Sequence, residues 1–352
     1  MVRRRGRATA IALLLFAACA AARQRPPAPA ESTSPPTGAA VIGHEEAGDR
    51  LYIADFKSGR LQAIGPADEI PHQPVWSPDG TRLAYRVGAR LLLHTEGGPD
   101  DATIAEDVEI ETQRPCAFTG DGRQLAVAGQ GAVVLVPVGE RTAPRPLVSR
   151  PDRRVGDLLW STDGRTLVVL FWSPGATSEV VRVRIADGTA DSQRADDVAR
   201  LLGWRPNGDL LVLRSGGGRD QPAVLTPSGL SPLRSLAEGL FVFDYAPAPD
   251  RLLIAAAGED TGQDSAVFLA SPAGAAPPVR WLASHPRLSD LHLSNDGRWS
   301  LFIDRSGDLE GRPGGSLYLA AVGSETARLV LRASAARSFS NPTPRPTGLR
   351  PR

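Results

Sequence analysis

The sequence predicts an all-β protein, a single β-propeller built from four-stranded blades. A motif recurs at intervals of forty-odd residues, short β-rich runs follow each copy, and no long amphipathic helix interrupts them. The motif is an aromatic or apolar residue, here called the anchor, followed by a tight turn. Such a period indicates one supersecondary unit repeated around a ring. The anchors, separated by 42, 42, 44, 41 and 48 residues, are Trp76, Phe118, Trp160, Trp204, Tyr245 and Leu293.

The clearest turn follows Trp76 and reads Ser77-Pro78-Asp79-Gly80. Proline fixes φ, the aspartate side chain binds nearby backbone, and glycine takes a positive φ at no steric cost. The β-rich runs around this turn are bounded by turn residues, as the strands of hairpins are. We therefore expect four strands in this repeat, at residues 72–76, 82–87, 90–95 and 102–106.

An apolar residue stands two positions before every anchor. A spacing of two places it on the same strand face as the anchor, so this face should pack against the neighbouring blade. Burying each large side chain there contributes on the order of 1.5–3 kcal/mol. The six residues are Pro74, Cys116, Leu158, Leu202, Phe243 and Leu291.

Both ends of the chain are expected to build a seventh blade. Six full repeats occupy about residues 70–335, and Phe339 lies 46 residues past Leu293, in phase with the period. Phe339 would therefore mark the innermost strand, while residues 41–44, 50–55 and 60–64 supply the outer three. Such closure removes exposed sheet edges. Seven blades are favoured; the alternative is six, with the N-terminal strands paired onto the sixth.

The N-terminus has the pattern of an export signal, so we expect the protein in the periplasm or at the cell surface. Four arginines precede an apolar stretch at residues 8–18, which is too short for a comfortable membrane span. We assign residues 1–18 to a signal peptide and 19–39 to a proline-rich spacer. The propeller should then occupy 40–342, followed by a flexible, basic, proline-rich tail at 343–352.

Cys19 ends the segment Leu-Phe-Ala-Ala-Cys, which resembles the lipobox of bacterial lipoproteins. The resemblance implies a diacylglycerol on the Cys19 sulfur and a tether to a membrane. Phe16 departs from the usual residue at its position. The alternative is an ordinary signal peptide, with Cys19 discarded. The other cysteine, Cys116, is expected to be a small buried hydrophobic residue without chemistry.

The charge balance and the motifs exclude several classes of function. The chain has 40 basic and 39 acidic residues, and removing residues 1–18 takes away four arginines, which leaves a net charge of about −3 (36 − 39). A basic surface for nucleic acid is therefore not indicated. The sequence contains no Gly-x-Ser-x-Gly elbow, no phosphate-binding glycine loop and no Cys or His cluster with zinc spacing. We expect no cofactor and no metal site.

Polar residues near the starts of the innermost strands form the candidate site. Four positions before an anchor stand His72, Arg114, Arg200 and Ser289, and close by are Gln73, Asp157 and Asp290. These strand starts should converge on the mouth of the central channel, where a peptide or small polar ligand would bind. The alternative is a channel mouth that is simply polar and hydrated. Asp244 and His292, both one position before an anchor, are a weaker acid–base pair without a nucleophile.

The string Trp-Ser-Pro-Asp-Gly-x-Arg-Leu-Ala at residues 76–84 resembles the repeat of TolB-like β-propellers, as do residues 118–126 and, more loosely, 160–168. The resemblance implies an exported propeller that binds other proteins or envelope components. We see no room before residue 41 for the small α/β domain of TolB, so its particular role is not carried over. The favoured function is a non-enzymatic binding scaffold; the alternative is a lyase or hydrolase with its site at the channel mouth.

Overall fold

The computed structural model describes residues 34–346, apart from short gaps at 99–100, 140–142, 175–177, 206, 217–218, 234–239, 249–250, 259–264, 272–277, 283–286, 295–296, 307–313 and 335. The predicted signal peptide, Cys19 and most of the spacer lie outside this part. Within it every regular element is a strand, and no helix is long and apolar enough to cross a membrane.

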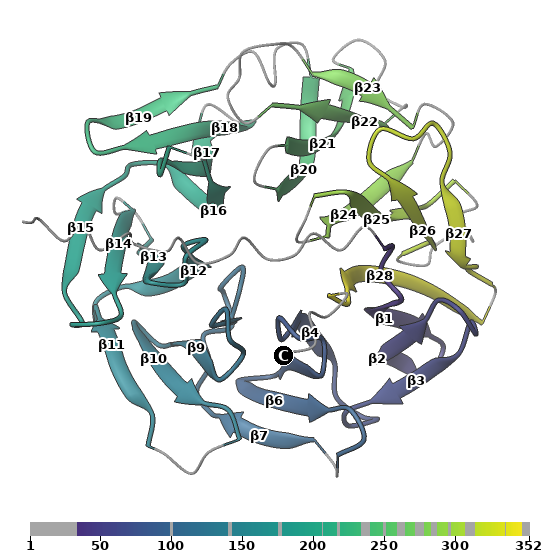
Figure 1. Cartoon of the computed structure of the whole chain (residues 1–352), viewed down its shortest axis with the longest axis horizontal. Helices are drawn as coiled ribbons and strands as arrows, with labels where there is room; N and C mark the ends of the chain where they lie inside the picture. Colours follow the sequence, from purple (N-terminus) through teal and green to yellow (C-terminus); the bar gives the residue numbers. More distant parts are fainter. Residues whose placement is uncertain are drawn as a thin grey trace, which may run out of the picture. The chain divides into compact units, whose positions relative to one another are not determined.

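The strands form seven four-stranded antiparallel sheets arranged as the blades of a ring (Figure 1), which confirms the seven-bladed propeller. We number the blades from the first complete repeat. Blade 1 contains β4 (Pro71–Trp76), β5 (Arg82–Val87), β6 (Arg90–Thr95) and β7 (Ala102–Ala105). Blade 2 contains β8 (Cys116–Phe118), β9 (Gln124–Gly129), β10 (Ala132–Pro137) and β11 (Arg145–Ser149). Blade 3 contains β12 (Arg154–Trp160), β13 (Thr166–Trp172), β14 (Glu179–Arg184) and β15 (Ala190–Arg194).

The next three blades repeat the order, with the innermost strand first in sequence. Blade 4 contains β16 (Val198–Trp204), β17 (Leu210–Gly216), β18 (Arg219–Thr226) and β19 (Gly229–Pro232). Blade 5 contains β20 (Leu240–Ala248), β21 (Arg251–Gly258), β22 (Ser265–Ala270) and β23 (Val279–Trp281). Blade 6 contains β24 (Leu288–Leu293), β25 (Trp299–Asp304), β26 (Ser316–Ala321) and β27 (Arg328–Leu331).

Blade 7 is assembled from both ends of the chain, as predicted. Its innermost strand is the C-terminal β28 (Arg337–Pro344), followed outward by β1 (Gly38–Glu45), β2 (Gly48–Asp55) and β3 (Leu61–Ile64). β28 includes the first two residues of the expected tail, and the backbone N–H of Arg345 still donates to the Gly38 carbonyl, 2.9 Å away. Residues 347–352 lie outside the described part.

The predicted register of blade 7 is wrong by five residues. Trp76 pairs with Leu83 at the base of its hairpin, and the matching pair in blade 7 joins Pro344 to Ala39. Pro344, not Phe339, is therefore the equivalent of the anchor. No hairpin turn follows this strand, because its partner comes from the other end of the chain, so nothing in the sequence marked the position. Phe339 is instead buried between blades 6 and 7.

Blade 5 carries a similar shift of two residues. Pro247 pairs with Leu252, and the bulge before Asp244 matches the bulge before Asp157 in blade 3. Pro247 is therefore the equivalent of Trp160, and Tyr245 is not the anchor. The shift follows from a tighter hairpin, in which the paired strands run on to Ala248 and Arg251.

The core lies between the blades. Seven apolar clusters are present among the described residues, and each joins two neighbouring blades. Cys116, Leu158, Leu202 and Leu291 are each no more than 3% exposed, as expected for residues two positions before an anchor. Anchor indoles add a polar tie to the preceding blade, because Trp160 Nε1 donates to Ala117 O at 3.0 Å and Trp204 Nε1 to Trp160 O at 2.9 Å.

Candidate functional site at the mouth

The inner strands begin at one end of the ring, which we call the mouth. Five polar residues lie there four positions before an anchor: His72, Arg114, Arg200, Ser289 and, with the corrected register, Ser340. The structure distributes the predicted site residues among several separate hydrogen-bonding groups around the mouth. These groups differ in how many of their hydrogen-bond donors and acceptors already have partners within the protein.

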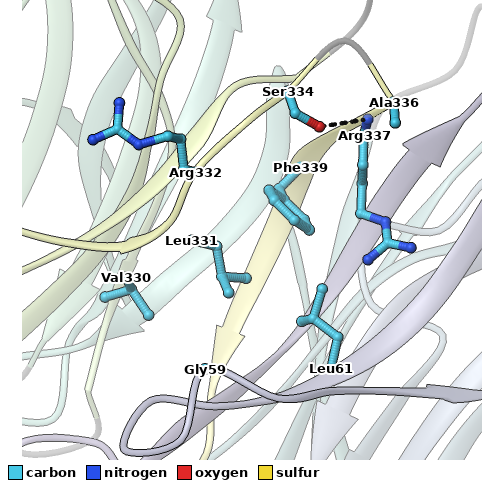
Figure 2. A pocket seen from close by; sticks show the side chains of 9 residues that line it. All are labelled: Gly59, Leu61, Val330, Leu331, Arg332, Ser334, Ala336, Arg337 and Phe339. Atoms are coloured by element: carbon cyan, nitrogen blue, oxygen red, sulfur yellow. Dashed lines mark hydrogen bonds between the residues drawn. The ribbon is translucent and has the colours of Figure 1, made fainter.

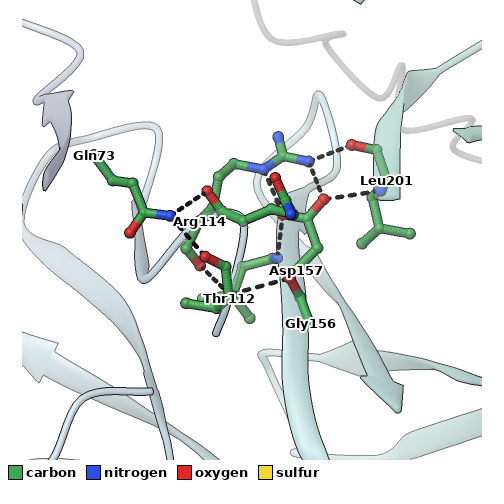
Figure 3. A network of polar contacts seen from close by, with 8 residues as sticks. Gln73, Thr112, Arg114, Gly156, Asp157 and Leu201 are labelled. Atoms are coloured by element: carbon green, nitrogen blue, oxygen red, sulfur yellow. Dashed lines mark hydrogen bonds and ion pairs between the residues drawn. The ribbon is translucent and has the colours of Figure 1, made fainter. Parts of the chain in front are cut away.

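Arg114 and Asp157 form a partly buried network that joins three blades (Figure 3). The Asp157 carboxylate is fully buried and accepts Arg114 Nε at 2.6 Å and Nη2 at 2.9 Å. It also accepts the backbone N–H groups of Leu158 at 2.9 Å and Leu201 at 2.8 Å. Burial opposes the charged form of Arg114, but the Asp157 charge outweighs it and raises the pKa of the guanidinium. With four donors around it, the carboxylate serves the scaffold and has no capacity left for a ligand.

Gln73 holds together the loops that enter blades 1 and 2. Its side-chain amide donates to the carbonyls of Thr112 at 2.6 Å and Gln113 at 3.1 Å (Figure 3). Its backbone takes the left-handed conformation, φ 50°, at a bulge of β4. Thr112 Oγ1 in turn donates to the Gly156 carbonyl of blade 3, at 3.2 Å. Gln73 is therefore also a tie within the protein.

Two guanidinium groups near the mouth have no carboxylate partner within the described ranges. Arg86 is 8% exposed, and its acceptors are the neutral oxygens of Gln73 at 3.2 Å and Gly88 at 2.7 Å. Burial lowers the pKa of Arg86. The Nε of Arg200 is buried without a hydrogen-bond acceptor in that same part of the chain. A ligand that brings a carboxylate to the mouth would meet uncompensated positive charge.

The imidazoles of His72 and His292 are both biased toward the neutral form. Partial desolvation, followed by the Arg86 charge, lowers the pKa of His72. Burial lowers the pKa of His292 to about 4, and the Arg200 charge acts in the same direction while Asp290 opposes it. Asp290 also lies 3.7 Å from Arg305 Nη2. The ring nitrogens of His72 and His292 are thus available as neutral donors or acceptors at neutral pH.

The expected pairing of Asp244 with His292 is wrong. The bulge register places Asp244 three positions before the anchor equivalent Pro247, so it matches Asp157 rather than His292. The sequence analysis also missed Ser340, His44 and Asp49, which are hydrogen-bonded to one another at the mouth. Their only signal was the correct register of blade 7, because Ser340 holds there the position that His72 holds in blade 1.

A pocket of about 460 Å³ lies between blades 6 and 7 (Figure 2). Leu61, Val330, Leu331 and Phe339 give it apolar walls. Arg337 also lines it, but its guanidinium already donates to Glu45 Oε1 at 2.5 Å and stacks over the Tyr52 ring. Among the described lining residues there is no carboxylate and no histidine. The pocket thus offers an apolar contact surface and no acid–base chemistry.

No group of three His, Cys, Asp or Glu side chains in the described part of the chain has the geometry of a metal site. No family model matches the sequence, and no curated protein sequence matches it. The comparison with solved structures, by contrast, finds many propellers.

TolB from Acinetobacter baumannii superimposes with a TM-score of 0.52 at 13% identity, covering 87% of this chain and 66% of TolB. A puromycin-hydrolyzing peptidase of Mycobacterium tuberculosis gives 0.60 at 17%, covering 83% of this chain and 51% of the peptidase. An oligogalacturonate lyase in complex with manganese gives 0.61 at 14%, covering 85% of both chains. The chain thus spans slightly less than two thirds of TolB and about half of the peptidase. At these identities the likeness shows the fold: a TolB-like seven-bladed β-propeller.

Proposed function

We propose that this chain is an exported propeller that binds a protein component of the cell envelope at its mouth. The observation that carries the proposal is a pair of exposed isoleucines. Ile70 is 56% exposed and Ile110 is 57% exposed. They lie in the segments that lead into β4 and β8, the inner strands of neighbouring blades. Large apolar side chains exposed in the segments that enter neighbouring inner strands favour a protein contact over a hydrated channel opening.

The two segments that carry these isoleucines are fixed to the scaffold. Gln73 bonds the backbone of the second segment to β4. Next to Ile70, Glu69 accepts Arg90 Nη2 at 2.5 Å, and next to Ile110, Glu111 pairs with Arg154. A surface held in place before binding loses little conformational entropy when a partner docks. Rigid blades that present loop residues in this way suit recognition.

The chemistry of the partner follows from two uncompensated charges elsewhere on the mouth, on blades 1 and 4. Arg86 and Arg200 lack a carboxylate within the described residues, so an acidic side chain of the partner would complete the pairing. We infer a partner segment that combines apolar side chains with at least one carboxylate. The resemblance to TolB-like propellers supports an envelope component as its source.

Export and lipid anchoring belong to the same proposal. Residues 1–18 direct export, and the lipobox-like segment ending at Cys19 would attach the mature chain to a membrane. The test is the mass of the mature N-terminal peptide, together with fractionation of a Cys19→Ser variant. An acylated Cys19 and release of the variant into the soluble fraction are the expected results. A mature N-terminus that lacks Cys19 would restrict the proposal to a soluble exported protein.

Photo-crosslinking residues placed at positions 70 and 110 test the binding surface in cells. We expect both to capture the same partner, and Ile70→Asp or Ile110→Asp to abolish its binding to the purified chain. Val279 is the matched control: it is 67% exposed, but begins β23 on the outside of blade 5. Val279→Asp should bind normally. Equal capture at all three positions, or binding that survives both aspartates, would overturn the proposed surface.

A further inference from the structure

Ser340, His44 and Asp49 form a hydrogen-bonded chain at the mouth of blade 7. Ser340 Oγ lies 2.7 Å from His44 Nε2, and His44 Nδ1 lies 2.8 Å from Asp49 Oδ1. Ser340 belongs to the innermost strand, β28, whereas His44 is the last residue but one of β1 and Asp49 is the second residue of β2. His44 and Ser340 are 296 positions apart in sequence, so segments near the two ends of the polypeptide meet in this hydrogen-bonded triad.

The direction of the hydrogen bonds follows from the groups themselves. An ionised carboxylate only accepts, so Nδ1 of a neutral His44 must carry the ring proton and donate to Asp49. This leaves the lone pair on Nε2, and the Ser340 hydroxyl must donate to it. A hydroxyl bonded to the free nitrogen of an imidazole, itself oriented by a carboxylate, is the arrangement that activates a serine for nucleophilic attack.

A second histidine–aspartate pair in the protein allows a comparison. His94 Nδ1 lies 2.7 Å from Asp101 Oδ1, almost the same geometry as His44 with Asp49. The second oxygen of Asp101 accepts the Tyr85 hydroxyl, and no hydroxyl within the described residues bonds to the other nitrogen of His94. A histidine–carboxylate pair therefore occurs twice in this propeller, but only the pair at the mouth meets a serine.

We propose that Ser340 is the nucleophile of an esterase site at the mouth, with His44 as general base and Asp49 as the residue that orients it. The Ser340 oxygen bonds to the ester carbonyl carbon while its proton passes to His44 Nε2. The C–O bond of the ester then breaks, and the alcohol leaves with that proton. Water attacks the acyl–serine, His44 takes and returns a proton, and the carboxylic acid departs with Ser340 restored.

Asn341 is the residue placed to stabilise the developing oxyanion. It directly follows the nucleophile, its side chain is exposed, and its backbone takes φ 48° at the bulge of β28. Its side-chain amide makes no hydrogen bond within the described part of the chain. A donor beside the nucleophile can bind the negative oxygen of the tetrahedral intermediate, a contact that strengthens only as charge develops.

The burial of Ser340, His44 and Asp49 determines the substrate class and the expected rate. Ser340 is only 7% exposed, while the side chains of His44 and Asp49 are 13% and 32% exposed. The enclosed hydroxyl admits a small acyl group, so acetyl and other short-chain esters are the substrates we infer. The hydrated carboxylate orients His44 less strongly than a buried one would. We therefore expect slow turnover with a measurable acyl–serine.

The test uses the full-length mature chain with p-nitrophenyl acetate and with a fluorophosphonate probe that labels activated serines. Ser340→Ala should abolish labelling and lower the hydrolysis rate at least about tenfold, since general-base activation contributes about 10²–10⁴-fold. Asn341→Gly should also slow hydrolysis, because glycine keeps the positive φ and removes only the amide. His44→Gln should slow acylation without preventing folding, which thermal unfolding will verify.

Two matched variants separate catalysis from structure. Ser300→Ala removes a serine hydroxyl buried on β25, away from the mouth residues, and His94→Gln removes the other histidine–carboxylate pair. Both should keep the wild-type labelling and rate. The proposal fails if the wild type reacts no faster than Ser340→Ala, or if His44→Gln and His94→Gln behave alike. It does not depend on the partner surface at Ile70 and Ile110, whose crosslinking can fail or succeed separately.

Discussion

Trp76 Nε1 donates a hydrogen bond to the carbonyl of Thr343, 3.1 Å away and 267 positions later in the chain. The Thr343 hydroxyl in turn donates to the Pro74 carbonyl at 3.1 Å. Arg345 lies over the Trp76 ring and donates to the Gly80 carbonyl at 2.8 Å. The same indole-to-carbonyl contact joins Trp160 to the preceding blade. The ring is thus closed across the chain ends by the contact that fastens neighbouring blades elsewhere.

Trp76→Phe should therefore destabilise the closure of the ring. It removes the hydrogen bond to Thr343 and part of the stacking with Arg345, so we expect a loss of about 1–3 kcal/mol in the free energy of unfolding. Trp204→Phe removes the equivalent bond to Trp160 within the continuous chain and is the control. Urea unfolding measures both. A smaller loss for Trp76 than for Trp204 would contradict the role of this contact in closure.

The buried pair of Arg114 and Asp157 should be a large single contributor to stability. Asp157→Asn keeps the shape but leaves the guanidinium without its counter-ion. Breaking a fully buried pair costs about 3–5 kcal/mol, and we expect the lower end of this range because the Arg114 side chain is 35% exposed. Arg114→Met with Asp157→Leu should recover much of this loss, which a double-mutant cycle measures. Asp196→Asn, in an exposed pair with Arg194, is the control and should change little. An equally small effect at Asp157 would show that the network is not structural.

The fold could be predicted because its signal is periodic and redundant. Trp76 and Trp160 each combine a turn motif with an apolar residue two positions earlier, and the structure places both in interfaces between blades. Where the turn is missing or altered, the prediction failed by a few residues. Phe339 has the expected spacing but does not pair at the anchor position. Tyr245 is not at the anchor position because its hairpin is tighter. A spacing along the chain fixes the number of blades, whereas a register depends on backbone pairing that spacing does not encode.

The site was less predictable, because its chemistry depends on contacts between distant segments. Position relative to the anchor put Arg114 and Asp157 in one candidate set of seven residues but gave no indication that each satisfies the other. The hydrogen-bonded triad of Ser340, His44 and Asp49 joins segments from both ends of the polypeptide, so no local sequence motif predicts it. Serine, histidine and aspartate at ordinary spacing become a candidate site only after the ring has closed.

Cys116 should be inert in the native protein. Its side chain is buried in the interface between blades 1 and 2, and burial raises the pKa of the thiol to about 12. Since the thiolate is the reactive species, a disulfide reagent at pH 8 should not label the folded chain but should label it fully in urea. The labelling rate would then report the opening of blade 2. Rapid labelling without denaturant would show that this interface is loose.

Stability should fall as the solution is acidified below about pH 6.5, through the titration of His292. Burial lowers the pKa of this imidazole to about 4 in the folded state, against an ordinary value of 6.5. Between these values the unfolded chain binds a proton that the folded chain does not, so the free energy of unfolding rises with pH across this window and levels off above it. The shift corresponds to at most about 3 kcal/mol, since the side chain is only partly buried. His292→Gln should flatten the slope between pH 4 and pH 6.5 in urea titrations, leaving the smaller contribution of His72, whose pKa is also lowered. An unchanged slope in the variant would mean that the pKa of His292 is not lowered in the folded protein, and that burial at the mouth does not oppose its protonation.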